Sequence, residues 1–273
     1  MIDWRHWHNE PFLTGGLILA GWLFAILAGP LRGRLAPGAA YPAGKAAAFY
    51  GALVLFYLAV GSPLDQVGER FLLSAHMVQH LLIMYPVPLL LLLGIPGWML
   101  DPVLGRPALR APLGLLFHPV TCALLSTGVL SLWHLPYLYE WTLQDKVVHV
   151  GEHLMFLAVS LLYWWPLASP SAVFPAPGYG IRMLYIFATE VAMIPVSAYL
   201  VFSGDILYPT YEYAPRLIAN FSPADDQLTA GIIMKISGMM VSLAALAVCF
   251  FRWSKASAGD TPAKAASPTV TGA

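Results

Sequence analysis

Seven stretches of apolar residues, each close to the length needed to cross a lipid bilayer, constrain this chain more than any other feature. A spanning helix needs about 20 mostly apolar residues, within a range of roughly 17–25. Hydrophobic residues make up 59% of the chain and charged residues only 10%, against roughly 25% charged in soluble domains. The sequence therefore predicts an integral membrane protein of the all-α class, with one bundle of seven transmembrane helices within residues 1–253. The stretches are Phe12–Ala28, Lys45–Val60, Phe71–Leu93, Leu115–Trp133, Val147–Leu167, Ile181–Phe202 and Leu228–Phe251.

The basic residues near these stretches predict how the bundle is oriented. Lysine and arginine concentrate on the cytoplasmic side of membrane proteins. One side collects Arg32, Arg34, Lys45, Arg106, Arg110, Arg182, Arg252, Lys255 and Lys264, and the other only Arg5, Arg70, Lys146 and Arg216. We therefore expect the N-terminus outside and the C-terminus in the cytoplasm. Residues 254–273 lack apolar bulk, which predicts a disordered cytoplasmic tail. A net charge of zero gives no reason to expect a nucleic-acid partner.

Two pairs of histidines, His76 with His80 and His149 with His153, lie within apolar stretches. Residues four apart share a helix face, and ionisable residues inside a membrane usually face the bundle interior and mark function. In the predicted topology both helices run inward from the outer side, and His134 ends a third helix at the same side. The five histidines therefore predict one metal or haem site in the outer half of the membrane. The alternative is that they only join helices through hydrogen bonds.

Imidazole ligands suit zinc, copper, iron and nickel, and thioether ligands favour Cu(I). Met77 is a candidate for such a softer contact, although methionine in a bundle usually fills space. Glu152 follows His149 by three residues, and Asp225 and Asp226 precede the last stretch. These acids are candidates for orienting the histidines or for forming an acidic mouth, and the aspartates are equally typical of a helix N-terminus. Neither cysteine lies near the predicted site, so a thiolate site is not expected.

Other polar residues within or beside the stretches have simpler interpretations. His6 and His8 adjoin tryptophans and are expected to anchor the chain at the membrane surface. His118 precedes Pro119, which predicts a helix start. A charge at the bilayer centre costs about 2.5–3.5 kcal/mol on insertion scales, so Glu190 and Lys235 are expected to form a pair between the last two helices. In the third stretch, Pro86 and Pro88 predict a kink.

Four motifs, taken together and in order, resemble those of a known family. From about Trp22 to Val248 the chain is similar to the polytopic CtaG-type cytochrome c oxidase assembly factors. The motifs are Ser74-Ala75-His76-Met77-Val78-Gln79-His80-Leu81-Leu82, Leu132-Trp133-His134-Leu135-Pro136-Tyr137-Leu138-Tyr139, His149…Glu152-His153 in a helix ending in Tyr163-Trp164-Trp165-Pro166, and Ser222-Pro223…Asp226-Gln227-Leu228-Thr229-Ala230-Gly231.

The resemblance implies a non-enzymatic protein of the bacterial inner membrane, surrounded by lipid, that supplies copper to the catalytic subunit of a haem–copper oxidase. Other copper chaperones are further expected partners. The family's shared histidines fall on His76, His80, His134, His149 and His153, with Asp226 nearby. Three alternatives stay open: a haemoprotein with one axial ligand from each pair, a zinc hydrolase with Glu152 or Asp226 as base, and a copper transporter. Against the hydrolase, the chain has no His-Glu-x-x-His motif.

Overall fold

The computed structural model describes residue 5 and residues 7–259 of the chain. Within these residues every regular element is a helix. The first eight are α1 (Pro11–Ala28), α2 (Arg32–Leu35), α3 (Ala43–Gly61), α4 (Pro63–Arg70), α5 (Leu73–Met84), α6 (Pro86–Gly94), α7 (Gly97–Leu104) and α8 (Pro107–Leu116). The others are α9 (Pro119–Trp133), α10 (Pro136–Gln144), α11 (Lys146–Ala168), α12 (Tyr179–Ala192), α13 (Ile194–Phe202), α14 (Pro209–Glu212) and α15 (Pro223–Gly259).

The helices form a multi-pass membrane bundle, as predicted. Among the described residues six helical segments are long and apolar enough to cross a membrane: α1, α3, α5 with α6, α11, α12 with α13, and α15. A seventh is added if the bent pair of α8 and α9 is counted as one span. The all-α class and six of the seven predicted spans are confirmed. The side of the membrane on which each terminus lies stays a prediction.

The fourth predicted span, Leu115–Trp133, is not one continuous helix. The chain breaks at His118, whose backbone is extended (φ −64°, ψ 133°), and α8 and α9 meet at a bend of 60°. The cause is Pro119, because a residue before proline is pushed out of the helical region. The remaining 15 residues of α9 reach only about 22 Å at 1.5 Å per residue, less than the roughly 30 Å of a bilayer core.

Prolines also interrupt two of the confirmed spans. The break between α5 and α6 falls at Tyr85, directly before Pro86, where the sequence predicts a kink. A second break, which was not predicted, separates α12 from α13 at Met193, two residues before Pro195. Proline removes a backbone donor and clashes with the preceding turn, so each span is built from two shorter helices.

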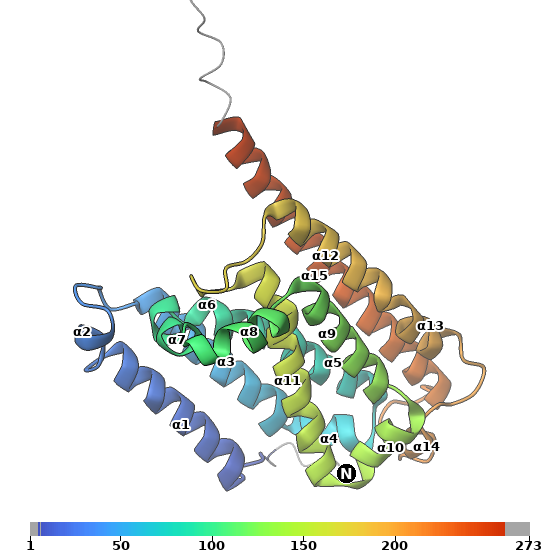
Figure 1. Cartoon of the computed structure of the whole chain (residues 1–273). Coiled ribbons are helices and arrows are strands. Elements are labelled where there is room, and N and C mark those ends of the chain that lie inside the picture. The colour runs from blue at the N-terminus through green and yellow to red at the C-terminus, as the bar shows by residue number, and fades with distance from the viewer. Residues whose placement is uncertain (1–4, 6, 260–273) are drawn as a thin grey trace, which may run out of the picture.

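Figure 1 shows the bundle with α1 at one edge and with α12, α13 and α15 side by side at the other. Helix α5 packs against α4, α11 and α15 in the interior. The short helices α4, α10 and α14 gather at the end of the bundle where α1 begins, and α15 runs past the opposite end (Figure 1). Helix α15 continues through Gly259, so residues 254–259 of the tail predicted to be disordered are helical. Residues 260–273 lie outside the described residues.

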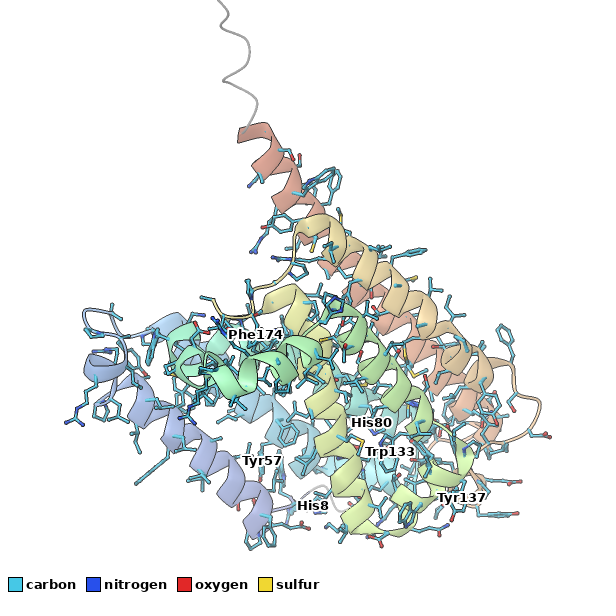
Figure 2. The ribbon with its side chains drawn as sticks, viewed as in Figure 1. His8, Tyr57, His80, Trp133, Tyr137 and Phe174 are labelled. Atoms are coloured by element: carbon cyan, nitrogen blue, oxygen red, sulfur yellow. The ribbon has the colours of Figure 1, made fainter. Side chains whose placement is uncertain are left out.

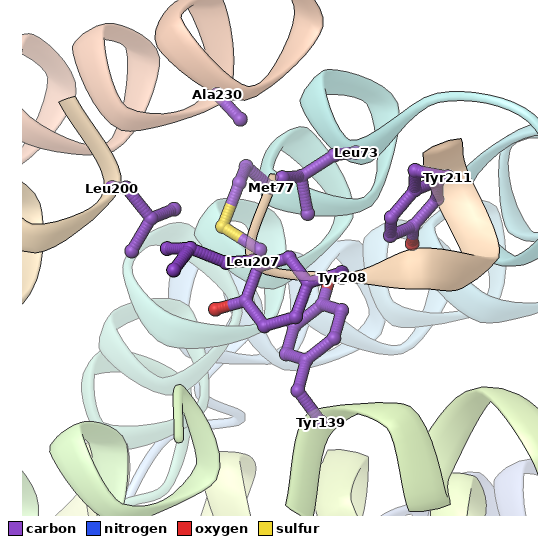
Figure 3. Close-up of a cluster of buried hydrophobic side chains, with 8 residues drawn as sticks. All are labelled: Leu73, Met77, Tyr139, Leu200, Leu207, Tyr208, Tyr211 and Ala230. Atoms are coloured by element: carbon purple, nitrogen blue, oxygen red, sulfur yellow. The ribbon is translucent and has the colours of Figure 1, made fainter. Parts of the chain in front are cut away.

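A cluster of buried side chains fixes α5 against the short helices and loops at this end (Figure 3). Tyr139 of α10 stacks on Tyr208, with ring centroids 4.1 Å apart, and neither side chain is exposed. Helices in lipid associate mainly through such close packing, because lipid tails are as apolar as the side chains. The cluster consists of Leu73, Met77, Tyr139, Leu200, Leu207, Tyr208, Tyr211 and Ala230.

Candidate metal centre

Helices α5 and α11 bring the two histidine pairs into contact. The ring centroids lie 4.3 Å apart in the pair of His76 and His80, and 4.2 Å apart in the pair of His149 and His153. Between the helices, His76 lies 5.3 Å from His149 and His80 lies 5.4 Å from His153. All four side chains are buried. The i,i+4 spacing therefore directs each pair at the other, within the bundle where Figure 2 labels His80.

Three of these histidines, together with Glu152, lie close enough to one another to bind one metal ion. One donor atom each from His76, His149, Glu152 and His153 lie within 4.8 Å of one another. The Nε2 atoms of His149 and His153 are 3.0 Å apart. Two ligands at about 2.0–2.1 Å from a tetrahedral metal lie roughly 3.3–3.4 Å apart. The two histidines of α11 are therefore already near ligand separation.

The partners of His76 leave its Nε2 atom free to bind a metal. The hydroxyl of Tyr211 donates to the carbonyl oxygen of Gly68 at 2.7 Å and lies 2.8 Å from Nδ1 of His76. Because that hydroxyl hydrogen is used, the Tyr211 oxygen can accept from Nδ1 of His76 in the tautomer that carries its proton there. The hydroxyl of Tyr139 lies 2.9 Å from the same nitrogen. In a neutral imidazole whose Nδ1 carries the proton, Nε2 presents its lone pair.

Two more histidines are held in the same tautomer. Nδ1 of His149 contacts the carboxylate of Glu69, and Nδ1 of His134 lies 2.6 Å from the carbonyl oxygen of Leu130. Both oxygen partners accept a hydrogen bond, so both rings donate through Nδ1 and keep a lone pair on Nε2. Carboxylates and carbonyls bonded to the far nitrogen of a metal-ligating histidine fix ring orientation and raise ligand basicity in this way.

Several buried polar atoms around this cluster have no hydrogen-bond partner among the described residues. Such atoms are rare in proteins, because an unsatisfied buried donor or acceptor costs about 1–3 kcal/mol. The carboxylate of Glu152 is one case: it is unexposed, and its nearest basic group is Nε2 of His80, 3.9 Å away. The unpartnered atoms are Nε2 of His76, both ring nitrogens of His80, Nε2 of His134 and both oxygens of Glu152. A cation bound by the four-residue set would satisfy Nε2 of His76 and an oxygen of Glu152, so this donor set fits a metal ion.

His80 and His134 border the four-residue set rather than belonging to it. Their ring centroids are 6.4 Å apart, and both rings contact Phe156. The backbone of His134 also contacts the cluster of Figure 3, because its carbonyl oxygen accepts a hydrogen bond from Tyr208 at 2.9 Å. The five predicted histidines thus lie in one buried region, and three of them belong to the donor set whose atoms lie within 4.8 Å of one another.

The remaining predicted site residues hold the surrounding helices. Asp226 binds the backbone amides of Leu73 and Ser74 at 2.6 and 3.0 Å, and it thereby caps the start of α5. Asp225 bonds only within its own turn, to Ser222. Met77 lies in the cluster of Figure 3 between α5 and the loop after α13. Asp226 therefore contributes to the position of His76 indirectly, because it holds the first turn of the helix that carries this histidine.

Helix α4 contributes residues that the sequence reasoning missed. Gly68 lies so close to α5 that a Cβ there would be 3.0 Å from Cα of His76. Asp65 accepts a hydrogen bond from Gln79 at 2.5 Å and lies 3.3 Å from the ring of His8. Asp65 and Glu69 are four residues apart, as in the histidine pairs. This spacing of two acids, directly before the third predicted span, is the sequence pattern from which they could have been identified as site residues.

The two carboxylates of α4 have different proton affinities. Burial, with the neighbouring charge of Glu69, raises the pKa of Asp65 to about 7. Burial also opposes ionisation of Glu69, but its hydrogen bond to His149 and the nearby positive charges outweigh that effect and lower the pKa of Glu69. At neutral pH Glu69 is therefore the more fully ionised of the two.

A cavity of about 560 Å³ lies beside the histidines. Its walls come from α1, α3, α4 and α11, and His149 and His153 line it. Three carboxylates line it too, those of Glu10, Asp65 and Glu69. Lys146 pairs with Glu10 beside them. The apolar remainder of the wall includes Phe12, Leu13, Leu17, Phe56, Val60 and Leu154.

Polar groups away from this centre agree with their predicted roles. The ion pair of Glu190 with Lys235 is confirmed, and Ser242 donates to the same carboxylate at 2.9 Å. His118 caps α9 by accepting from the backbone amide of Val120 at 3.3 Å. Cys122 and Cys249 are buried in one apolar cluster with Tyr185 and Ile186.

One comparison with known proteins identifies relatives. The model of the family described as cytochrome c oxidase caa3 assembly factor (Caa3_CtaG) matches residues 22–256, which is most of the chain. No curated protein and no solved structure gives a significant match. The matched range includes every histidine of the candidate metal centre and excludes most of α1.

Proposed function

This chain belongs to the cytochrome c oxidase caa3 assembly factor family, and from that premise we propose that it carries copper to the oxidase. In this proposal His76, His149, Glu152 and His153 hold the ion. The recipient is the catalytic subunit of a haem–copper oxidase in the bacterial inner membrane. The protein acts as a metallochaperone, and copper is its cargo.

The observation that carries this proposal is the buried set of four donors within 4.8 Å, in which His76 directs an unpartnered Nε2 inward. Imidazole and carboxylate donors suit several first-row metals, and the order of divalent affinities peaks at copper. A haem–copper oxidase requires copper during assembly, so family membership selects copper from the metals that the donors allow. His80 and His134 supply further imidazoles next to the set, to which the ion can shift during transfer.

The arrangement of the histidines is less suited to a haem, and the donor set is less suited to tight retention of the ion. Two axial histidines of a haem lie on opposite faces of a macrocycle. Here the rings of His76 and His149 are 5.3 Å apart, and the Nε2 atoms of His149 and His153 are 3.0 Å apart, which leaves no room for a porphyrin between them. Among the described residues no cysteine belongs to the donor set. Neutral imidazoles release an ion more readily than a closed thiolate cage, as a carrier requires.

The test combines metal content with oxidase assembly. Wild-type protein and the His76→Ala and His153→Ala variants are purified, loaded with copper and desalted, and copper is measured by elemental analysis. The same variants are expressed in cells that lack their own copy of the factor. We expect about one copper per wild-type chain, loss of copper in both variants, and oxidase activity that tracks copper content.

His118→Ala is the matched control, because it removes a histidine that caps α9 outside the donor set. It should keep both copper and oxidase assembly. Copper binding by neither the wild type nor the control, or full oxidase activity with His76→Ala and His153→Ala, contradicts the proposal. Copper flux across proteoliposomes that contain the wild type would identify a transporter instead of a carrier.

A further inference from the structure

Outside the four-donor set, a second group of metal-ligating side chains lies in the cavity. One donor atom each from Asp65, Glu69 and His149 lie within 4.8 Å of one another. Asp65 and Glu69 come from α4, and the cavity of about 560 Å³ reaches all three. Asp65 is 6% exposed, whereas the Glu69 side chain is 20% exposed. The group therefore extends from the bundle interior toward the open part of the cavity.

His149 belongs to both groups and faces them with different atoms. Its Nδ1 contacts Glu69, and its Nε2 lies 3.0 Å from Nε2 of His153. An ion bound among the carboxylates would take Nδ1, and an ion bound among the histidines would take Nε2. A neutral imidazole has one lone pair, so it serves one of these ions at a time.

The donor chemistry changes along the cavity. The outer group offers two carboxylates and one imidazole, and the inner group offers three imidazoles and one carboxylate. Carboxylate oxygens are harder ligands than imidazole nitrogens, and copper binds imidazole well. All three residues of the outer group line the cavity, whereas His76 and Glu152 of the inner group do not, so an ion in the cavity has access to the complete outer group before the complete inner one.

The charge of the cavity also favours a cation. Three carboxylates line the cavity, and the only lysine among its described wall residues is Lys146, which pairs with Glu10. Ionised carboxylates beside low-dielectric walls concentrate cations, and fields of this kind raise association rates by about 10–10³-fold. Here the apolar residues of α1, α3 and α11 supply such walls.

We propose that Asp65, Glu69 and His149 form a loading station, which captures a copper(II) ion from the cavity and passes it to the inner histidines by exchange of the His149 nitrogens. When the ion is at the station and bound to Nδ1 of His149, the single proton of the neutral ring is on Nε2. When the ion moves inward, Nε2 releases that proton to water in the cavity, and Nδ1 takes up a proton from the same water and donates to Glu69 again. The inference rests on the proposed copper site, and it adds the route by which that site is filled.

The test measures the rate of copper uptake by the full chain in lipid nanodiscs. Copper(II) is supplied as its weak complex with glycine, and bound copper is measured over time after rapid desalting. The variant is Asp65→Asn with Glu69→Gln, which removes both ionisable carboxylates but keeps oxygen acceptors for Gln79 and for Nδ1 of His149. Glu10→Gln is the matched control, because it removes a cavity carboxylate outside the station.

We expect copper to associate with the double variant about tenfold more slowly than with the wild type. Its copper affinity should also fall, because Glu69 orients His149 and raises the basicity of that ligand. Its uptake should also lose the salt dependence that wild-type uptake shows. The Glu10→Gln variant should stay within about twofold of the wild-type rate. Wild-type protein should bind one tightly held copper, because the station and the inner site share His149.

Two results would overturn the inference: wild-type association rates in the double variant, or two tightly held ions in the wild type. If the double variant does not fold, the single variant Glu69→Gln is measured, with a slowing of about threefold expected. Failure of the copper site itself looks different, because the wild type would then take up no copper at any rate.

Discussion

Replacing Asp226 with alanine distinguishes a structural role for this residue from a role in metal binding. Its carboxylate is 1% exposed and accepts hydrogen bonds from the amides of Leu73 and Ser74, at the start of the helix that carries His76. The variant leaves both amides without an acceptor. The first turn of α5 should loosen, while the donor set of the metal centre stays chemically complete.

The expected magnitude follows from the two hydrogen bonds. A hydrogen bond to a charged group contributes about 1.5–3 kcal/mol, and the loss of one partner leaves the other group buried and unsatisfied. The two bonds share one carboxylate, so their effects do not add in full. We expect Asp226→Ala to lower the free energy of unfolding by about 3 kcal/mol. Asp226→Asn keeps one acceptor oxygen and should lose about half as much.

Two measurements follow the effect. Denaturation in mixed detergent micelles gives the free energy of unfolding, and amide hydrogen exchange detected by mass spectrometry reports on Leu73–Met84. Exchange should increase in the first turn of this segment. The control is Asp225→Ala, whose carboxylate bonds only to Ser222 in its own turn, and which should leave exchange in α5 unchanged.

Copper binding decides between the two roles of Asp226. If Asp226 only positions α5, the folded variant still binds one copper, with an affinity reduced far less than by His76→Ala. Wild-type stability and unchanged exchange in Asp226→Ala, combined with complete loss of copper, would refute the structural role and identify Asp226 as a ligand.

Three further predictions concern single side chains. Tyr211→Phe removes the acceptor for Nδ1 of His76 and should weaken copper binding by about 10–100-fold in a direct titration, whereas unchanged affinity would contradict the tautomer argument. Lys235→Met leaves Glu190 without its cation and should destabilise the protein by about 2 kcal/mol. Adding Glu190→Gln to this variant should restore most of the lost stability. If it restores none, the pairing is contradicted. Burial raises the pKa of Asp65 to about 7, above the 3.8 usual for an aspartate, so the folded state holds this proton more tightly than the unfolded state. The thermal midpoint of metal-free protein should therefore fall as pH rises from 5 to 7, and Asp65→Asn should reduce that slope.

The sequence predicted the histidine cluster because two independent regularities coincide there. The i,i+4 spacing places both members of a pair on one helix face, and the positions of the pairs within their spans place them at similar depth. The pair of Glu190 and Lys235 was predictable for another physical reason, since an isolated charge in lipid is costly. Both inferences could be made without knowing the contacts between individual helices.

Other parts of the site depend on contacts that periodicity does not encode. Asp226 reaches amides about 150 residues away in the chain, and helix register at that contact is set by packing of the whole bundle. Asp65 and Glu69 lie in a short polar helix outside the spans, so a search for intramembrane ligands passes over them. The fourth predicted span was wrong in extent because apolar composition does not register the break before Pro119.

The account depends most on copper being held by imidazole nitrogens, and X-ray absorption at the copper edge of loaded protein tests this directly. We predict a first shell of nitrogen and oxygen atoms at about 2.0 Å, with the scattering pattern of about three imidazole rings. The signal should disappear when His76, His149 and His153 are replaced together. Sulfur ligands at about 2.3 Å, or a spectrum that survives the triple replacement, would contradict the account.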